Sequence, residues 1–297
     1  MLVSDKWKDF EVIDASSGER LERWGKYILV RPDPQVIWNT PHDAPGWKKK
    51  NAHYHRSVKG GGSWEFFDLP EEWTISYDLC SAGKKLTFNL KPFSFKHTGL
   101  FPEQAANWEW MASLIGDALK KEPSREIRIL NLFAYTGGAT VSCAAAGAKV
   151  THVDASKGMT QWAKENSRLS GIPEDRCRWI TDDCVKFVKR EIRRGNHYDG
   201  ILMDPPSYGR GPGGEVWKLE DNIFSLIEET EELLSKKPLF FLINSYTTGL
   251  QPAVLRYMLG TALQKKRGGT VSAHEIGLPV TFSGLVLPCG AAGRWNM

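Results

Sequence analysis

Four aspartates in the middle of the chain each follow a short run with the composition of a buried strand. They are Asp154, Asp182, Asp183 and Asp204. A carboxylate in such a position can accept hydrogen bonds from hydroxyl or amino groups of a bound ligand. Ligands of open, mostly parallel sheets lie beyond the carboxyl ends of the strands, so we expect these four side chains to share one crevice.

The segment before Asp154 has the pattern of a nucleoside-binding unit. Residues 127–133 are mostly apolar and predict a buried strand, and residues 134–138 form a glycine-containing turn. Small apolar residues at 139–146 predict a helix packed closely on a sheet, and residues 149–153 predict a second strand. Glycines let a ligand approach the backbone, and an acid at the tip of the second strand can accept hydrogen bonds from a ribose diol.

Two common phosphate-binding motifs are missing from the sequence. The turn lacks the G-x-G-x-x-G pattern of dinucleotide sites, and the chain contains no G-x-x-x-x-G-K-[ST]. A nucleoside without a pyrophosphate therefore fits better than a dinucleotide. The alternative is an ordinary α/β turn with an aspartate at the end of a strand.

Length and composition are those of a globular protein. The chain has 297 residues, of which 41% are hydrophobic and 25% charged, and its net charge is only +4, so nucleic-acid binding would need a local basic patch. The five cysteines are scattered without a C-x-x-C pair, which argues against a zinc site and fits a reducing compartment. Without a signal peptide or a long apolar run, we expect a cytoplasmic protein that does not contact a membrane.

Residues 1–95 predict a small β-rich domain that is distinct from residues 96–297. Short β-type runs alternate there with proline and glycine. These runs are residues 10–13, 27–31, 36–38, 63–67, 73–79 and 86–90. Between them, basic and aromatic residues mix over 47–59 and could hold phosphates and stack bases, although a solvated loop with lysine tips is the alternative. Residues 96–104 are a polar connection.

In the second part, strands alternate with helices, which predicts a mostly parallel sheet. The further strands are expected at residues 178–181, 197–203, 239–244, 270–276 and 282–287. The helices are expected at residues 105–120, 156–169, 185–194, 219–234 and 252–265. Four glycines between Gly209 and Gly214 predict a mobile loop that closes over substrate.

Four segments resemble class I S-adenosylmethionine-dependent methyltransferases, above all the group that modifies bases of large-subunit ribosomal RNA. They are residues 131–138, 153–154, 182–183 and 204–208, in the family's order and spacing. Residues 96–104 also look like that group's Lys-Thr-Gly-x-Phe segment, with His97 as an extra residue. The resemblance implies an α/β fold, with a Rossmann-like seven-stranded methyltransferase domain behind the smaller β-rich domain. The implied strand order is 3-2-1-4-5-7-6, with the last strand antiparallel.

The resemblance also implies the cofactor, S-adenosyl-L-methionine, and the residues that bind it. These are Thr98, Gly99, Phe133, Ala134, Tyr135, Thr136, Gly137, Gly138, Asp154, Ala155, Asp182, Asp183 and Asp204. Residues 133–138 would wrap the methionine part, and Asp154 would bind the ribose hydroxyls. Asp183, or Asp182 beside it, would face the adenine amino group.

Asp204, Pro205, Pro206 and Tyr208 are the candidate catalytic residues. Amino-methylating relatives carry [Asn/Asp]-Pro-Pro-aromatic, in which a side-chain oxygen and a backbone carbonyl accept hydrogen bonds from the target amino group. The aromatic ring stacks on the base, but here Ser207 separates it from the prolines. Methylation of cytosine C5 needs a cysteine thiolate, and Thr247 occupies the position of that cysteine. Transfer to a nitrogen is therefore favoured.

The predicted partner is RNA, most simply ribosomal RNA, bound by a monomer or homodimer without a metal. Methylation of a protein side chain or a small molecule is a second hypothesis, motivated by the low net charge. A third is a non-catalytic, cofactor-binding factor of RNA or ribosome assembly.

Overall fold

The computed structural model describes residues 1–57, 61–93, 96–210, 216–247 and 249–297. The first part of the chain forms β1 (Leu2–Val3), β2 (Phe10–Ser16), β3 (Glu19–Trp24), β4 (Tyr27–Pro32), β5 (Ala52–Arg56), β6 (Gly62–Phe66), β7 (Trp73–Leu79) and β8 (Lys84–Leu90). Then come α1 (Ala105–Lys121), β9 (Arg128–Leu132), α2 (Gly138–Ala145), β10 (Lys149–Asp154), α3 (Lys157–Leu169), β11 (Cys177–Thr181) and α4 (Cys184–Arg194). The last part forms β12 (Gly200–Met203), β13 (Tyr208–Arg210), β14 (Val216–Lys218), α5 (Leu219–Glu231), β15 (Phe240–Ser245), α6 (Pro252–Leu259), α7 (Lys265–Arg267), β16 (Thr270–Pro279) and β17 (Val286–Asn296).

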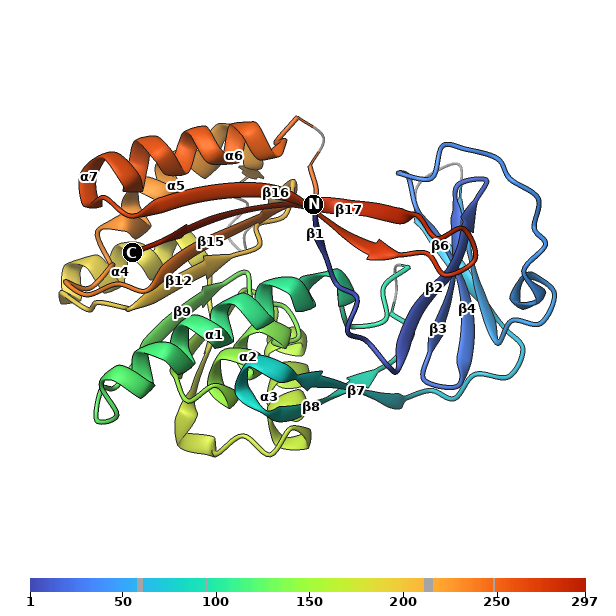
Figure 1. The fold of residues 1–297 in the computed structure, drawn as a ribbon, viewed down its shortest axis with the longest axis horizontal. Helices are drawn as coiled ribbons and strands as arrows, with labels where there is room; N and C mark the ends of the chain where they lie inside the picture. Colours follow the sequence, from blue (N-terminus) through green and yellow to red (C-terminus); the bar gives the residue numbers. More distant parts are fainter. Residues whose placement is uncertain (58–60, 94–95, 211–215, 248) are drawn as a thin grey trace.

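A twisted sheet of eight strands forms the larger part of the molecule (Figure 1). Its order is β1-β16-β17-β15-β12-β9-β10-β11, and only β17 runs antiparallel to its neighbours. Counted from β9, this is the 3-2-1-4-5-7-6 order that the resemblance implied. The expected seven strands are joined by an eighth, because β1 at the start of the chain pairs in parallel with β16.

Side chains of the central strands alternate between two hydrophobic cores. Ile129, Leu202 and Leu242 face the core that α1 and α2 cover. Their neighbours Leu130, Ile201 and Ile243 face the core that α4, α5 and α6 cover. This period of two, with apolar residues on both faces, is what a sheet buried between helical layers requires.

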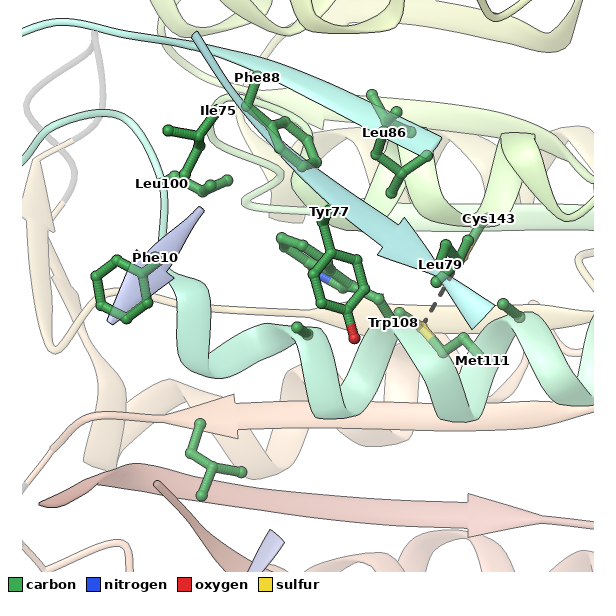
Figure 2. Close-up of a cluster of buried hydrophobic side chains, with 14 of the residues drawn as sticks. Phe10, Ile75, Tyr77, Leu79, Leu86, Phe88, Leu100, Trp108, Met111 and Cys143 are labelled. Atoms are coloured by element: carbon green, nitrogen blue, oxygen red, sulfur yellow. Dashed lines mark hydrogen bonds between the residues drawn. The ribbon is translucent and has the colours of Figure 1, made fainter. Parts of the chain in front are cut away.

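The first of these cores continues into the β-rich part of the chain. Trp108 and Met111 of α1 pack near Tyr77 and Phe88 of the β7–β8 hairpin, and Cys143 of α2 closes the group (Figure 2). β8 also contacts α3, and Trp162 Nε1 of α3 donates to the backbone of β8. The hairpin therefore packs against the helical layer that covers the eight-stranded sheet.

A second sheet, β2-β3-β4-β5-β6, makes up the rest of the β-rich part (Figure 1). Five of the six predicted runs contain strands, but residues 36–38 form no regular secondary structure. β3 and β5 were not predicted as strands. Charged residues hide β3 in the sequence, because two of its buried side chains, Arg20 and Glu22, are ions that pair inside the fold.

The structure describes residues 47–57 of the mixed basic and aromatic stretch. Trp47 and Tyr54 are buried, whereas Lys48 and Lys49 are exposed. Exposed lysines fit both a solvated loop and a phosphate-binding surface, so contact of this stretch with phosphates or bases stays a prediction.

The last strand is the main error of the sequence prediction. Residues 282–287 were expected as a strand, but the chain turns there and β17 continues to Asn296. The turn attaches to β2, where Thr281 N donates to Val12 O and Phe282 N donates to Ile13 O, at 3.0 and 2.9 Å. β17 contains Gly290 and Gly293, and glycine has low strand propensity. Neighbouring atoms of β15 and α6 leave no room for a side chain at either position.

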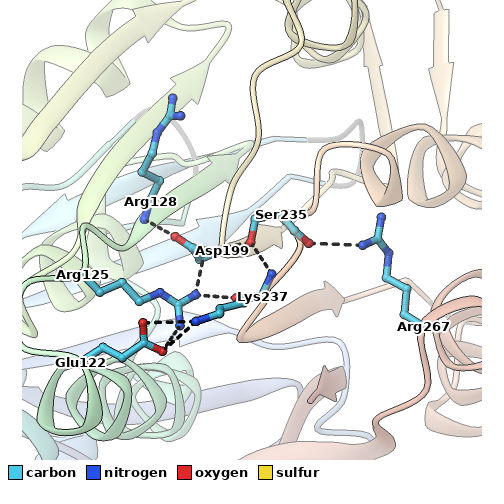
Figure 3. Close-up of polar contacts among 7 residues, drawn as sticks. All are labelled: Glu122, Arg125, Arg128, Asp199, Ser235, Lys237 and Arg267. Atoms are coloured by element: carbon cyan, nitrogen blue, oxygen red, sulfur yellow. Dashed lines mark hydrogen bonds and ion pairs between the residues drawn. The ribbon is translucent and has the colours of Figure 1, made fainter.

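At the opposite end of the sheet from the predicted site, Asp199 ties several segments together (Figure 3). Its carboxylate accepts hydrogen bonds from Arg128 N and Arg125 Nη2, at 2.9 and 2.8 Å. Ser235 Oγ donates to the same carboxylate at 2.9 Å. These bonds hold the amino ends of β9 and β12 together.

Within the described residues, no helix is long and apolar enough to cross a membrane. The predicted mobile loop at 209–214 falls mostly on residues 211–215, which lie outside the described part of the chain.

Gly290→Ala should destabilise the fold. A Cβ atom there would lie 2.8 Å from Ser245 O, which is backbone and cannot move aside. We expect the free energy of unfolding to fall by about 1–3 kcal/mol. Gly116→Ala is the matched control, since its Cβ would meet nothing closer than 4.0 Å. Because Gly116 lies within α1, this change should stabilise by about 0.5–1 kcal/mol. Urea denaturation measures both; equal midpoints would refute the crowding argument.

Candidate active site

A pocket opens beyond the carboxyl ends of β9, β12 and β15. It is lined by six of the predicted site residues, which are Phe133, Ala134, Tyr135, Thr136, Gly138 and Asp204. Gln104, Asn131 and Asn244 also line it and were not predicted. The other predicted residues do not line this pocket, and their places are described below.

The turn after β9 adopts an unusual backbone conformation. Phe133 and Tyr135 have φ angles of 54° and 51°, although neither is glycine, and Gly137 has φ of 82°. Left-handed conformations of this kind cost L-residues about 1–2 kcal/mol each. Surrounding bonds must therefore hold the turn, and strain of this sort is concentrated at binding sites.

Asp154 supplies one of these bonds. Its Oδ2 accepts a hydrogen bond from Tyr135 N and its Oδ1 accepts one from Ser156 N, both at 2.8 Å. Burial raises the pKa of the carboxyl, and the two N–H donors act in the opposite direction. Each oxygen keeps a second lone pair, so the carboxylate can still accept bonds from ligand hydroxyls. Ala155 lies between Asp154 and the Ser156 cap of α3.

Asp182 and Asp183 both have structural partners. Asp183 caps α4, since its Oδ1 accepts a hydrogen bond from Lys186 N at 2.8 Å. Asp182 pairs with Arg190 and accepts a bond from Asp183 N. Their predicted contact with an adenine amino group stays a prediction.

Residues 96–101, which we call the connecting segment, lie against the turn. Thr136 Oγ1 donates a hydrogen bond to Gly99 O at 2.5 Å. Gly99 has φ of 99°, and a Cβ there would lie 2.2 Å from the Trp162 ring. Thr98 is fully buried, and its hydroxyl has no hydrogen-bond partner among the described residues.

Buried ions of the β-rich part hold the connecting segment from the other side. Arg31 makes two bonds to the Glu22 carboxylate, at 2.6 and 2.9 Å, and its Nη1 donates to Lys96 O at 2.9 Å. Lys96 Nζ donates to Pro32 O at 3.0 Å. Burial lowers the pKa of Lys96 to about 8. These contacts link β3 and β4 to the segment beside the site.

Asp204 directly follows β12 and lines the pocket. Burial raises the pKa of Asp204 to about 7, and the negative charge of Glu103 adds to the rise. Glu103 is itself buried, its Oε2 has no hydrogen-bond partner in the part of the chain described, and burial raises its pKa as well. Two carboxyl groups therefore lie in a poorly solvated region where a ligand amino group could be bound.

A polar network that the sequence analysis did not predict includes Gln104 and Asn244, which line the pocket. Gln104 Nε2 donates to Tyr246 Oη at 2.6 Å. Asn107 Nδ2 donates to Gln104 Oε1 and Asn244 Oδ1, at 2.8 and 3.0 Å, and Arg294 of β17 holds Asn107. Asn244 had a detectable signal, since it is a polar residue at the end of a predicted strand.

The residues after Asp204 are arranged differently from the predicted motif. Tyr208 starts the β13–β14 hairpin, is about half exposed and does not line the pocket. Trp217 of β14 comes closer to the prolines, since its Nε1 donates to Pro206 O at 2.7 Å. Its ring centroid lies 5.5 Å from that of Phe133. The hairpin joins distant residues, so sequence spacing could not reveal Trp217.

The cysteines are poorly placed for nucleophilic chemistry. None of them lines the pocket, and Cys143, Cys177, Cys184 and Cys289 are buried. Burial raises the pKa of Cys177 to about 11 and that of Cys184 further. Thr247, at the position of the expected cysteine, shares a hydrogen bond with Ser207. The described site therefore offers no thiolate.

The site has features that fit S-adenosylmethionine. The buried hydroxyls of Thr98 and Tyr135 lack partners among the described residues, as groups that await a ligand would. Asp154 offers acceptors suited to a ribose, and the apolar and small residues of the turn suit the methionine part.

Comparison with known proteins identifies the family. A family model described as S-adenosylmethionine-dependent methyltransferase matches residues 65–249. A crystal structure of the SAM-dependent methyltransferase from Agrobacterium tumefaciens is 36% identical, covers 99% of this chain and 92% of its own, and has a TM-score of 0.90. A protein from Streptococcus mutans, described as a putative SAM-dependent methyltransferase, shares the fold with a TM-score of 0.74 at 16% identity.

Curated relatives match a shorter part of the chain. Ribosomal RNA large subunit methyltransferase K/L of Shewanella woodyi is 34% identical over 154 residues, or 52% of this chain. The chain spans only 19% of the length of that relative. A putative ribosomal RNA large subunit methyltransferase of Methanocaldococcus jannaschii is 34% identical over 118 residues, or 40% of this chain and 29% of that protein.

The chain belongs to the S-adenosylmethionine-dependent methyltransferase family. This confirms the family, the enzyme class and the cofactor that the sequence predicted.

Asp154→Ala should weaken binding of S-adenosylmethionine. The change removes the predicted ribose acceptor and leaves the N–H groups of Tyr135 and Ser156 without their partner. A loss of about 1–3 kcal/mol, or roughly 5- to 150-fold in Kd, is expected. Isothermal calorimetry measures it, with Asp117→Ala on the exposed face of α1 as the control. Unchanged affinity in the Asp154 variant would contradict the assignment.

Proposed function

We propose that this methyltransferase transfers a methyl group to a nitrogen of a base in ribosomal RNA. The observation that carries the proposal is Asp204, which follows β12, precedes Pro205 and Pro206, and lines a pocket whose lining residues include no cysteine. The names of the curated relatives support ribosomal RNA as the substrate.

Different residues would bind the cofactor and orient the target nitrogen. The turn at 133–138, the Asp154 carboxylate and the connecting segment would hold the cofactor, which supplies an electrophilic methyl group when bound. The Asp204 carboxylate would accept a hydrogen bond from the target amino group, and a proline backbone carbonyl would accept a second one. These bonds would direct the nitrogen lone pair at the methyl group. Placing the nitrogen, the methyl carbon and the sulfur in line contributes more to such a transfer than strong base catalysis does.

Asp182 or Asp183 would complete the cofactor site at the adenine end. Because each already makes a structural bond, the contact would use a remaining lone pair or the backbone. Tyr208 and Trp217 are aromatic residues of the β13–β14 hairpin, which follows the Asp-Pro-Pro segment. We assign the stacking role to Trp217, because its indole is anchored on Pro206.

Purified protein supplied with tritiated cofactor should label RNA. Total RNA and total protein are offered together, and Asp204→Ala serves as the control. We expect label in RNA, and nucleoside analysis should show an N-methylated base and no 5-methylcytosine. Label confined to protein or small molecules would support the second hypothesis instead. Intact cofactor binding without any label would favour the non-catalytic alternative.

The rate of methyl transfer should depend on the ionisation of Asp204. With its pKa raised to about 7, the carboxyl is mostly protonated below that pH, and the neutral acid is a weaker acceptor of the amino hydrogen bond than the carboxylate. The kcat is therefore expected to rise between about pH 5.5 and 8.5 with a midpoint near 7. Asp204→Asn keeps a carbonyl acceptor and should retain some activity with a flat profile. A sloping profile in that variant would assign the titration to another group, such as Glu103.

A further inference from the structure

A group of potential metal ligands lies on the β-rich part of the chain, apart from the methyltransferase pocket. One ligand atom from each of His53, His55 and Glu65 lies within 4.8 Å of the other two. The imidazole ring centroids of the two histidines are 4.0 Å apart. We call this group the histidine face.

The strand geometry explains why the three side chains converge. His53 and His55 are two positions apart on β5, so both point to the same face of the sheet. Glu65 on β6 pairs directly with His53 in the antiparallel register and therefore points to that face too. Three donors are thus held by two hydrogen-bonded strands rather than by loops.

A fourth residue supports the orientation of the first histidine. Oε1 of Glu19, in β3, lies 2.6 Å from Nε2 of His53. In metal sites, a carboxylate commonly accepts a hydrogen bond from the ring nitrogen that does not bind the metal. With Nε2 directed at Glu19, Nδ1 of His53 remains for a metal ion. His55 Nε2 and Glu65 Oε2 lie 2.8 Å apart, and small rotations of these exposed side chains would admit an ion between them.

A pocket adjoins this face and leaves room for a further ligand. His55, Glu19 and Arg56 line it, together with the turn between β2 and β3. The fourth position of the ion would therefore remain open to water or to an anionic group in the pocket.

We propose that the histidine face binds a divalent transition-metal ion, with Zn²⁺ as the best match. Two imidazoles and one carboxylate are the donor set of many open Zn²⁺ sites, with metal–ligand bonds of about 2.0–2.2 Å. A tetrahedral ion with such bonds holds its ligand atoms about 3.4 Å apart, which small rotations of the three side chains can reach. The unpaired cysteines argued against a zinc site, but this one uses no cysteine.

Zn²⁺ binding tests the proposal on the full chain. Protein treated with chelator is titrated with Zn²⁺ against a chromophoric competitor, in a Cys80→Ser background because Cys80 is an exposed thiol. One equivalent of tight binding is expected. His55→Gln and Glu65→Gln should each weaken it at least tenfold, and Glu19→Gln should weaken it about 10- to 100-fold through the orientation of His53. His197→Gln, an exposed histidine elsewhere, is the control and should leave binding unchanged.

The alternative is that the two histidines only pair with the two glutamates. In that case the parent protein binds no stoichiometric Zn²⁺, or the His55 and Glu65 variants bind it as tightly as the parent, and either result overturns the proposal. Circular dichroism and S-adenosylmethionine binding check the fold of each variant. If a variant does not fold, the d–d spectrum of Co²⁺ added to the parent decides, since a tetrahedral site absorbs strongly and hydrated Co²⁺ does not.

Discussion

The hydrogen bond from Tyr135 N to the Asp154 carboxylate is the interaction on which the site depends. It joins the ends of β9 and β10 and holds a turn in which two residues other than glycine have positive φ. An unsupported chain would relax from that conformation, because each such residue costs free energy. The same carboxylate is left with lone pairs for a ligand, so one group both shapes the pocket and is available to bind in it.

The site also depends on parts of the chain that lie outside the central sheet. The connecting segment is bonded on one side to Thr136 of the turn and on the other to Arg31 of β4. Arg31 in turn is paired with the fully buried Glu22. Removing one partner of such a pair leaves a buried charge without compensation. The β-rich part thus positions the segment that closes one side of the pocket, and its hydrophobic core is continuous with that beneath α1.

Several site residues were predictable because they lie next to the strands that place them. Asp154 and Asp204 follow apolar runs, and the parallel strands bring both to one edge of the sheet. Tyr208 was expected to stack on the substrate, but it starts a hairpin and is half exposed. Trp217 contacts Pro206 instead, and Asn244 and Gln104 meet through Asn107 of α1. The contact between Asn107 and Asn244 joins residues 137 positions apart, and no local pattern encodes it.

The sequence by itself determined the alternation of strands and helices, the strand-end carboxylates and the family, because these depend on local periodicity and on short motifs. Only the tertiary structure decided the course of β17, the burial of Glu22 and Arg31, and the meeting of β5 with β6. Gly290 and Gly293 lie in a strand despite their low strand propensity. They are glycine because neighbouring atoms leave no room for a larger side chain. Glu22 of β3 is buried because Arg31 of β4 and Arg20 of β3 itself neutralise it. Such outcomes depend on what surrounds a residue in space, which its neighbours in sequence do not specify.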